Sequence, residues 1–182
     1  MRKSIAAALA GLALVGLAGT ASADDTTPVY KTKAELQKQA DEFTAHQLQS
    51  LPQIFPGARF VTPGLWGGER DGVLEDGQQY MANEVKYFYN GEKRSVITQV
   101  MAPGFFGSSP EELCEQHYRS CTGTVSDDEG GVIVFSELAE YRMRSVHSFR
   151  PNGEVVFTQG SLDDDPAQLG TVAADRAYTF TR

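Results

Sequence analysis

The stretch YMANEVKYFYNGEKRSVITQVMA, residues 80–102, decides the fold. Two runs rich in aromatic and β-branched residues flank Asn90-Gly91, a dipeptide that favours the positive φ angles of a two-residue hairpin turn. Such a turn pairs apolar residues across the two strands on one face: Met81 with Val100, and Val85 with Val96. Polar side chains then lie mainly on the other face: Glu84, Lys86 and Gln99. The sequence therefore predicts an antiparallel hairpin with one face toward a core.

Further strands are predicted on both sides of this hairpin. A second hairpin is expected over residues 141–160, YRMRSVHSFRPNGEVVFTQG, with its turn at Pro151-Asn152-Gly153. Short β-rich runs occupy residues 59–62 and 132–135. These segments are joined as hairpins rather than as strand–helix–strand units, which is typical of an antiparallel sheet.

Three segments carry helix-start signals. Two of them open with a capping box, in which a hydroxyl and a carboxylate three residues apart bond to each other's backbone amides: Thr32 with Glu35, and Ser109 with Glu112. The first helix is amphipathic and is expected to end at Pro52. A C-terminal helix is expected after Asp165, with Pro166 at its first position. The sequence therefore predicts an α+β fold: an antiparallel sheet built from hairpins, with an N-terminal helix, a short middle helix and a C-terminal helix packed on one face.

The N-terminus has the three parts of a secretory signal. Arg2 and Lys3 precede an apolar run over residues 5–17, and Ala21-Ser22-Ala23 forms a small-residue cleavage site. We therefore expect residues 1–23 to be a signal peptide, residues 24–31 a flexible N-terminus, and residues 32–182 a single domain in the extracellular space. The apolar run is shorter than the roughly 20 residues of a membrane span, so no membrane span is expected.

The charge of the chain restricts its partners. The formal net charge is −8, and loss of the two cations of the signal peptide would make it −10. Long-range repulsion then opposes general binding to nucleic acids or anionic membranes. The sequence has no phosphate loop, nucleotide fingerprint or H-E-x-x-H pair, so no cofactor and no metal are expected.

Both cysteines lie in CEQHYRSC, residues 114–121. A metal site would use Cys114, His117 and Cys121, but zinc needs a further ligand or an open position that the sequence does not supply nearby. Export to an oxidising compartment favours a disulfide between Cys114 and Cys121. An unbroken helix would hold the two Cα atoms roughly 10 Å apart, so the helix is expected to end before Cys121.

Two surfaces are candidates for contact with a ligand or a partner. Trp66 lies in the glycine-rich segment 63–77 and is able to stack on a ligand, or else folds back onto the core. In the strand of residues 141–150, the period of two places three arginines on one face: Arg142, Arg144 and Arg150. An exposed row of this kind binds carboxylates or phosphates, unless neighbouring acidic side chains neutralise it. His147 falls on the opposite, apolar face, which favours a core histidine over a catalytic one.

Three short motifs are similar to those of a group of small secreted actinobacterial proteins without assigned function. The motifs are LPQIFPGARFV after the first helix, the cysteine pair followed by a turn and a strand, and RPNGEVV before QLGTVAADRAY. The resemblance implies secretion and a disulfide, and it implies no catalytic residue.

Two functional hypotheses follow from the sequence. The first is a secreted protein that binds an anionic ligand or an extracellular protein without catalysis. The second is a small extracellular hydrolase with His147 or His117 as general base. A histidine close to a serine or a carboxylate in a concave pocket would favour the hydrolase.

Overall fold

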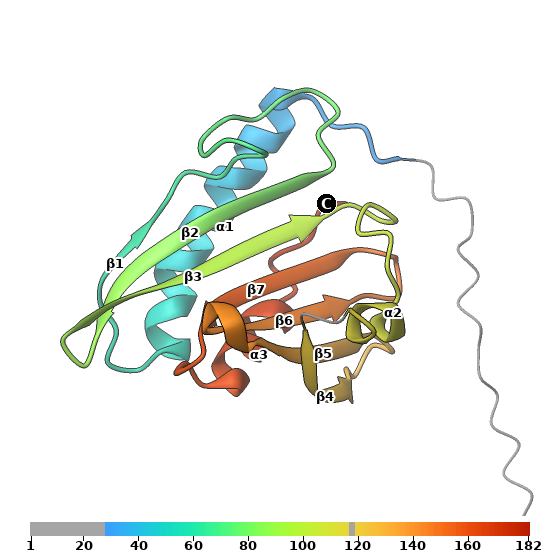
Figure 1. Ribbon diagram of the computed structural model, residues 1–182. Coiled ribbons are helices and arrows are strands. Elements are labelled where there is room, and N and C mark those ends of the chain that lie inside the picture. Colours follow the sequence, from blue (N-terminus) through green and yellow to red (C-terminus); the bar gives the residue numbers. More distant parts are fainter. Residues whose placement is uncertain (1–27, 117–118) are drawn as a thin grey trace, which may run out of the picture.

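The computed structural model describes residues 28–116 and 119–182. Within these ranges the chain forms a seven-stranded sheet in the order β1-β2-β3-β7-β6-β5-β4, and every neighbouring pair is antiparallel (Figure 1). The strands are β1 (Arg59–Pro63), β2 (Tyr80–Tyr89), β3 (Glu92–Met101), β4 (Ser120–Ser126), β5 (Val132–Leu138), β6 (Met143–Phe149) and β7 (Val155–Ser161). The predicted α+β class is confirmed.

The helices cover both faces of the sheet. α1 (Lys33–Ile54) and α3 (Pro166–Ala174) lie behind the sheet as drawn in Figure 1, and their apolar side chains form the core with β2, β3, β6 and β7. α2 (Pro110–Cys114) lies on the opposite face, which we call the front face, and contacts β5. The prediction that all three helices share one face is therefore wrong for α2. The long β3–β4 connection carries α2 across the front of the sheet, where Phe106 packs on His147 and Phe149.

The first hairpin has the predicted register. Met81 pairs with Val100 and Val85 with Val96, and all four side chains are buried. Asn90 and Gly91 have φ angles of 52° and 83°, as the two-residue turn requires. The turn and the alternation of apolar residues are thus consistent, and together they fix the register.

The helix starts are also confirmed, but the end of α1 differs from the prediction. Both capping boxes form, and the Asp165 side chain caps α3. α1 continues through Pro52 to Ile54. Leu51 and Phe55 are both buried in the core, and the Phe55 amide donates to the Leu51 carbonyl at 2.8 Å, so packing carries the helix past the proline.

Residues 28–31 are held in place rather than loose. Val29 packs against the core, and Lys31 is buried and donates from Nζ to the Gln39 side chain at 3.0 Å. The predicted signal peptide and residues 24–27 lie outside the described residues. None of the helices in the described ranges is both long and apolar enough to cross a membrane.

A buried ion pair ties the C-terminal segment to the second hairpin. The Glu154 side chain is fully buried, and one of its oxygens accepts from the Arg150 guanidinium at 3.1 Å. The same carboxylate accepts from the Thr179 hydroxyl at 2.9 Å, and from the Thr181 amide and hydroxyl at 2.7 and 2.6 Å. Arg150 also donates to the Asp175 carbonyl at 2.9 Å. This network holds residues 175–181 across the end of the core.

Glu154→Gln should destabilise the fold, because it leaves the buried Arg150 guanidinium without its counter-charge. We expect a loss of about 3 kcal/mol in the free energy of unfolding, measured by urea denaturation. Glu140→Gln, which removes an exposed carboxylate, is the control and should change the same quantity by less than about 0.5 kcal/mol. Equal stability of the two variants would contradict the role given to Glu154.

The same pair should make stability depend on pH. Burial alone would raise the pKa of Glu154, but hydrogen bonds from Thr181 and Thr179 and the charge of Arg150 hold it below its ordinary value of 4.5. A carboxyl group with a lowered folded-state pKa stabilises the fold above its unfolded pKa, and this contribution is lost as the pH falls through the folded pKa. The free energy of unfolding should therefore fall from about pH 5 to about pH 3, and the fall should be smaller in Glu154→Gln. An unchanged slope in the variant would show that other carboxylates carry the effect.

Candidate functional site

The sheet opens where β3 and β7 separate. The two strands pair only from Ile97 with Gln159 to Met101 with Val155, whereas β3 pairs with β2 along its whole length. On the back face an ion pair spans the opening, with Arg94 Nη1 at 2.8 Å from Asp164 Oδ1. The front of the opening is left as a hollow of about 320 Å³.

This first hollow has a mixed polar and apolar lining. Its apolar side chains include Tyr141 and Met143, which are 60% and 38% exposed. Arg142 also lines it, 3.5 Å from Asp163. The surface therefore has an aromatic ring, a cation and a thioether in consecutive residues at the start of β6.

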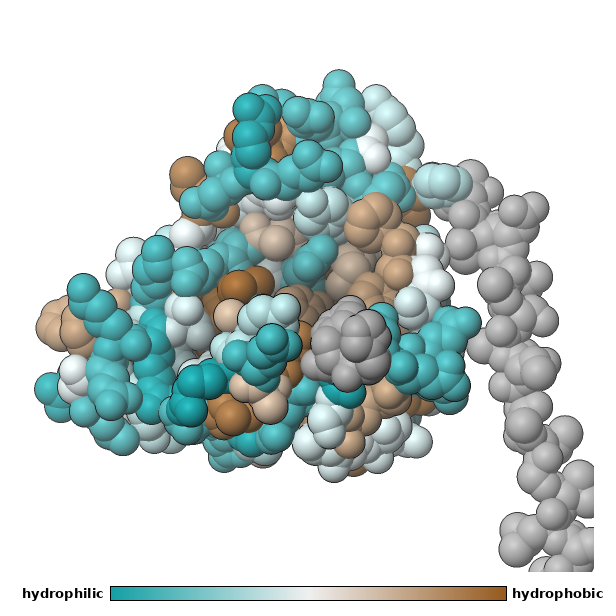
Figure 2. Space-filling view, viewed as in Figure 1, coloured by the Kyte–Doolittle hydropathy of each residue, from teal (hydrophilic) through white to brown (hydrophobic). Residues whose placement is uncertain are grey.

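A second hollow of about 530 Å³ lies beside the first, on the front of β1, β2 and β3. Phe60 and Phe88 form its apolar part, with ring centroids 6.0 Å apart in an edge-to-face arrangement. The two hollows share Lys93, Arg94 and Ser95 in their linings. We call the combined surface the front groove. Figure 2 shows this face of the molecule, with apolar side chains in brown between hydrophilic ones in teal.

The front groove is richer in cations than the rest of this acidic chain. Four basic residues line it against three acidic ones: Lys86, Lys93, Arg94 and Arg142 against Glu84, Glu92 and Asp163. Lys86 lies 3.2 Å from Glu84, and the Ser95 hydroxyl and Lys86 together hold the pKa of Glu84 below its ordinary value. Lys93 is exposed and takes part in none of the ion pairs between described residues. It is therefore the cation best placed to meet an incoming anion.

Phe60 is held in the groove by an unfavourable backbone conformation. Its φ angle is 56°, in the left-handed region, and its side chain is 78% exposed. This conformation costs a bulky residue about 1–2 kcal/mol. Phe60 lies where the register of β1 and β2 shifts between Arg59 and Thr62, and burial of its ring does not repay the cost of the strain, so it is a candidate contact residue.

Of the three arginines predicted to share an exposed face, only Arg142 lies at the groove. Arg142 has a φ angle of 52° and ends the 3₁₀ helix η1 (Ala139–Tyr141), so it does not continue the alternation of β6. Arg144 is largely buried, donating to Glu137 at 2.6 Å, and Arg150 is buried against Glu154. The prediction of an exposed row is wrong because helices cover that face of β6. Acidic neighbours instead neutralise Arg144 and Arg150, which was the alternative prediction for this face.

Trp66 lies in the core rather than on a contact surface. It is 4% exposed and packs against Phe43 and Tyr178, with ring centroids 5.1 and 6.4 Å away. The Gly67 amide and carbonyl bond to Ala82 at 3.0 and 2.8 Å, which holds the 63–77 segment along β2. Trp66 therefore follows the alternative reading, in which it folds back onto the core.

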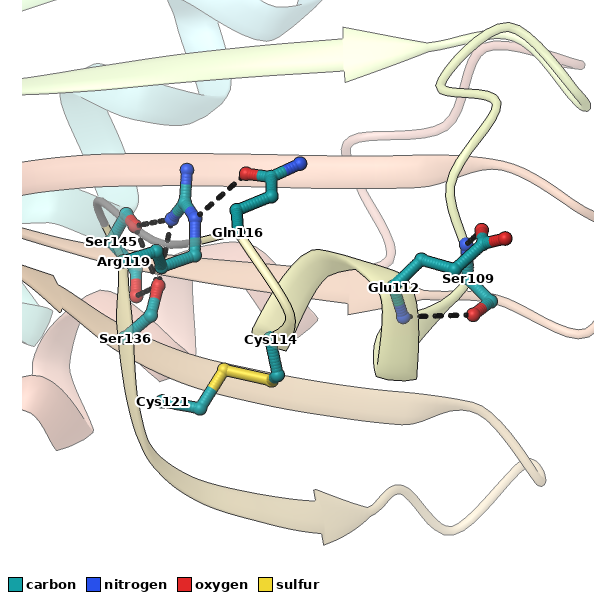
Figure 3. Close-up of a disulfide and its surroundings, with 8 residues drawn as sticks. All are labelled: Ser109, Glu112, Cys114, Gln116, Arg119, Cys121, Ser136 and Ser145. Carbon is teal, nitrogen blue, oxygen red and sulfur yellow. Dashed lines mark hydrogen bonds between the residues drawn. A yellow bond between two sulfur atoms is a disulfide. The ribbon is translucent and has the colours of Figure 1, made fainter.

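The cysteines form the expected disulfide, and α2 ends at Cys114 as the geometry requires. The Cα atoms of Cys114 and Cys121 are 5.5 Å apart, and the bond joins α2 to the edge strand β4 (Figure 3). Beside it, Arg119 Nη1 donates to the hydroxyls of Ser136 and Ser145 at 2.8 and 2.7 Å. The disulfide excludes the metal alternative, since both thiolates are consumed. Within the described ranges, no group of three or more His, Cys, Asp or Glu side chains is arranged to hold a metal.

The described histidines do not form a catalytic centre in the front groove. His147 is 2% exposed and lies among Phe106, Phe149 and Phe157. Burial, with a smaller contribution from the charge of Arg119, lowers its pKa to about 3. His46 lies 2.6 Å from Asp175, and neither residue lines the front groove. His117, the other proposed base, lies outside the described residues.

Most residues of the front groove are not among the contact residues predicted from the sequence. Phe88 shares the outward face of its strand with Glu84 and Lys86, so an aromatic residue on a polar face was an available signal. Phe60 and Tyr141 carried no such signal, because a left-handed residue and a 3₁₀ turn place them.

Comparison with known proteins does not assign a function to this site. No protein-family model, no curated protein and no solved structure matches the chain. The candidate site therefore rests on its geometry alone.

The disulfide should contribute measurably to stability. Closing a loop whose ends are seven positions apart is worth about 2.5 kcal/mol in the chain-entropy model. Replacing both Cys114 and Cys121 by serine should lower the free energy of unfolding by about that amount. The intact mass of the oxidised protein should lie about 2 Da below that of the reduced form, and complete thiol labelling without reductant would contradict the pairing.

The His147 imidazole should remain neutral in the folded protein from about pH 8 to about pH 5, because burial lowers its pKa to about 3. Its ring proton resonances should not move between about pH 8 and about pH 5. A titration of these resonances near neutral pH would instead revive His147 as a candidate general base.

Proposed function

We propose that this chain is a secreted, disulfide-stapled protein that binds its ligand without catalysis, and that the front groove is its binding surface. The observation that carries the proposal is Phe60, whose ring is exposed in the groove by a strained backbone. The ligand is an anion with apolar groups. The resemblance to small secreted actinobacterial proteins supports the extracellular location, as do the signal-like N-terminus and the disulfide.

The charges of the groove support an anionic ligand. The formal net charge of the chain is −8, yet Lys93 in the groove takes part in none of the ion pairs between described residues. The pair of Arg142 with Asp163 is exposed on both sides, and such pairs contribute little to stability. An incoming carboxylate or phosphate would therefore find Lys93 without an ion-pair partner among the described residues, and Arg142 easily released from Asp163.

The alternative of a hydrolase has less support. A general base works best when its pKa lies near the working pH, and the pKa of His147 is far below that range. The pair of His46 and Asp175 has suitable geometry for a dyad, but it lies away from the groove where a substrate would sit.

Anilinonaphthalene sulfonate is a suitable probe, because it combines aromatic rings with an anionic group and fluoresces on apolar surfaces. The wild-type protein should enhance its fluorescence at a saturable site. Phe60→Ala and Lys93→Glu should each weaken this binding about tenfold. Fluorescence titration measures the dissociation constants.

Two variants serve as matched controls. Leu65→Ala removes an exposed apolar side chain outside the groove, and Lys38→Glu makes the same charge change on α1. Both should bind the dye as the wild type does. Equal dye binding by Phe60→Ala and wild type, with the fold intact by circular dichroism, would overturn the proposed function.

A further inference from the structure

The front groove is long and shallow, which restricts the shape of its occupant. It runs across the strands from β1 to β6, through β2, β3 and β7. Three strand spacings of about 4.8 Å and the wider gap between β3 and β7 make this path at least about 19 Å long. An extended peptide of about six residues covers that distance. A compact small molecule would contact only one end of it.

The two ends of the groove resemble the centre of a protein interface. Phe60 and Phe88 lie at one end, and Tyr141, Arg142 and Met143 at the other. Aromatic residues, Met and Arg are the types enriched where proteins bind each other. Four of these five side chains are large hydrophobics exposed in the free chain, so a partner would bury apolar surface at both ends.

The charge in the middle of the groove specifies an acidic occupant. Lys93 belongs to both hollows and has no acidic partner among the described residues, so it lies between the two apolar ends. A carboxylate bound there would pair with a cation that is otherwise only solvated. A second carboxylate near Arg142 would compete with Asp163, which lies 3.5 Å away.

The second hollow suits an apolar peptide side chain better than the hydroxyls of a sugar polymer. Sugar hydroxyls need many hydrogen-bond partners, and leaving them unpaired against phenyl rings is costly. The second hollow is lined at one end by Phe60 and Phe88, and its carboxylate, Glu84, is already engaged by Ser95 and Lys86. The occupant favoured by this chemistry is a peptide.

We propose that the front groove binds an extended, acidic segment of a partner protein, about six residues long, that sets one apolar side chain against Phe60 and Phe88 and one carboxylate against Lys93. This inference rests on the proposed function and narrows its ligand class.

The test is selection from a phage-displayed library of random dodecapeptides on the immobilised mature protein. The selected peptides should be rich in Asp and Glu and share an aromatic or large aliphatic residue. Synthetic copies should bind Lys93→Glu and Phe60→Ala at least about tenfold more weakly than wild type, as judged by fluorescence anisotropy. Leu65→Ala and Lys38→Glu should bind them as the wild type does. Replacing the acidic residues of a selected peptide by their amides should cause a similar loss.

Other outcomes separate this inference from the proposed function. If no selected peptide depends on Lys93 and Phe60 while dye binding does, the peptide inference fails and the binding function stands. If oligogalacturonate displaces the dye and no peptide does, the occupant is an acidic polysaccharide, and the inference is again overturned. If dye binding is also independent of both residues, the two proposals fail together.

Discussion

The short pairing between β3 and β7 is the constraint on which the rest of the structure depends. It joins the half-sheet β1-β2-β3 to the half-sheet β7-β6-β5-β4 through five paired positions. Beyond Ile97 and Gln159 the strands separate, and the ion pair of Arg94 with Asp164 bridges the back of the opening. Because both members of that pair are largely buried, the separation is held at a defined width and does not collapse. The front groove is the solvent side of this opening.

Two further interactions stabilise the sheet that carries the groove. The pair of Arg150 with Glu154 fastens the C-terminal segment to the second hairpin, and the disulfide fastens α2 to the edge strand β4. Both lie away from the groove. Half of the front face is covered by the β3–β4 connection, where Phe106 packs on His147 and Phe149. The other half is left open. The strained Phe60 lies there, as does Lys93, which has no ion-pair partner among the described residues.

The local features of the fold could be predicted from the sequence, because each depends on residues close together in the chain. The Asn90-Gly91 turn, both capping boxes and the end of α2 before Cys121 are of this kind. That α3 covers the arginine face of β6 could not be predicted, and this caused the errors at Arg144 and Arg150. Period-two alternation separates the two faces of a strand but does not show which face is exposed when helices cover both. The groove was missed because strands distant in the sequence meet there.

The most direct test of the central claim is a map of where an anionic apolar probe binds. Amide proton–nitrogen spectra of labelled protein comprising residues 24–182 would be followed during titration with anilinonaphthalene sulfonate. The account predicts that the largest shifts cluster at the apolar end of the groove and its middle, at Phe88 and at Lys93 to Ser95. A cluster instead at Leu48, Leu65 and Gly72, which line a separate hollow of about 400 Å³ beside α1, would contradict it.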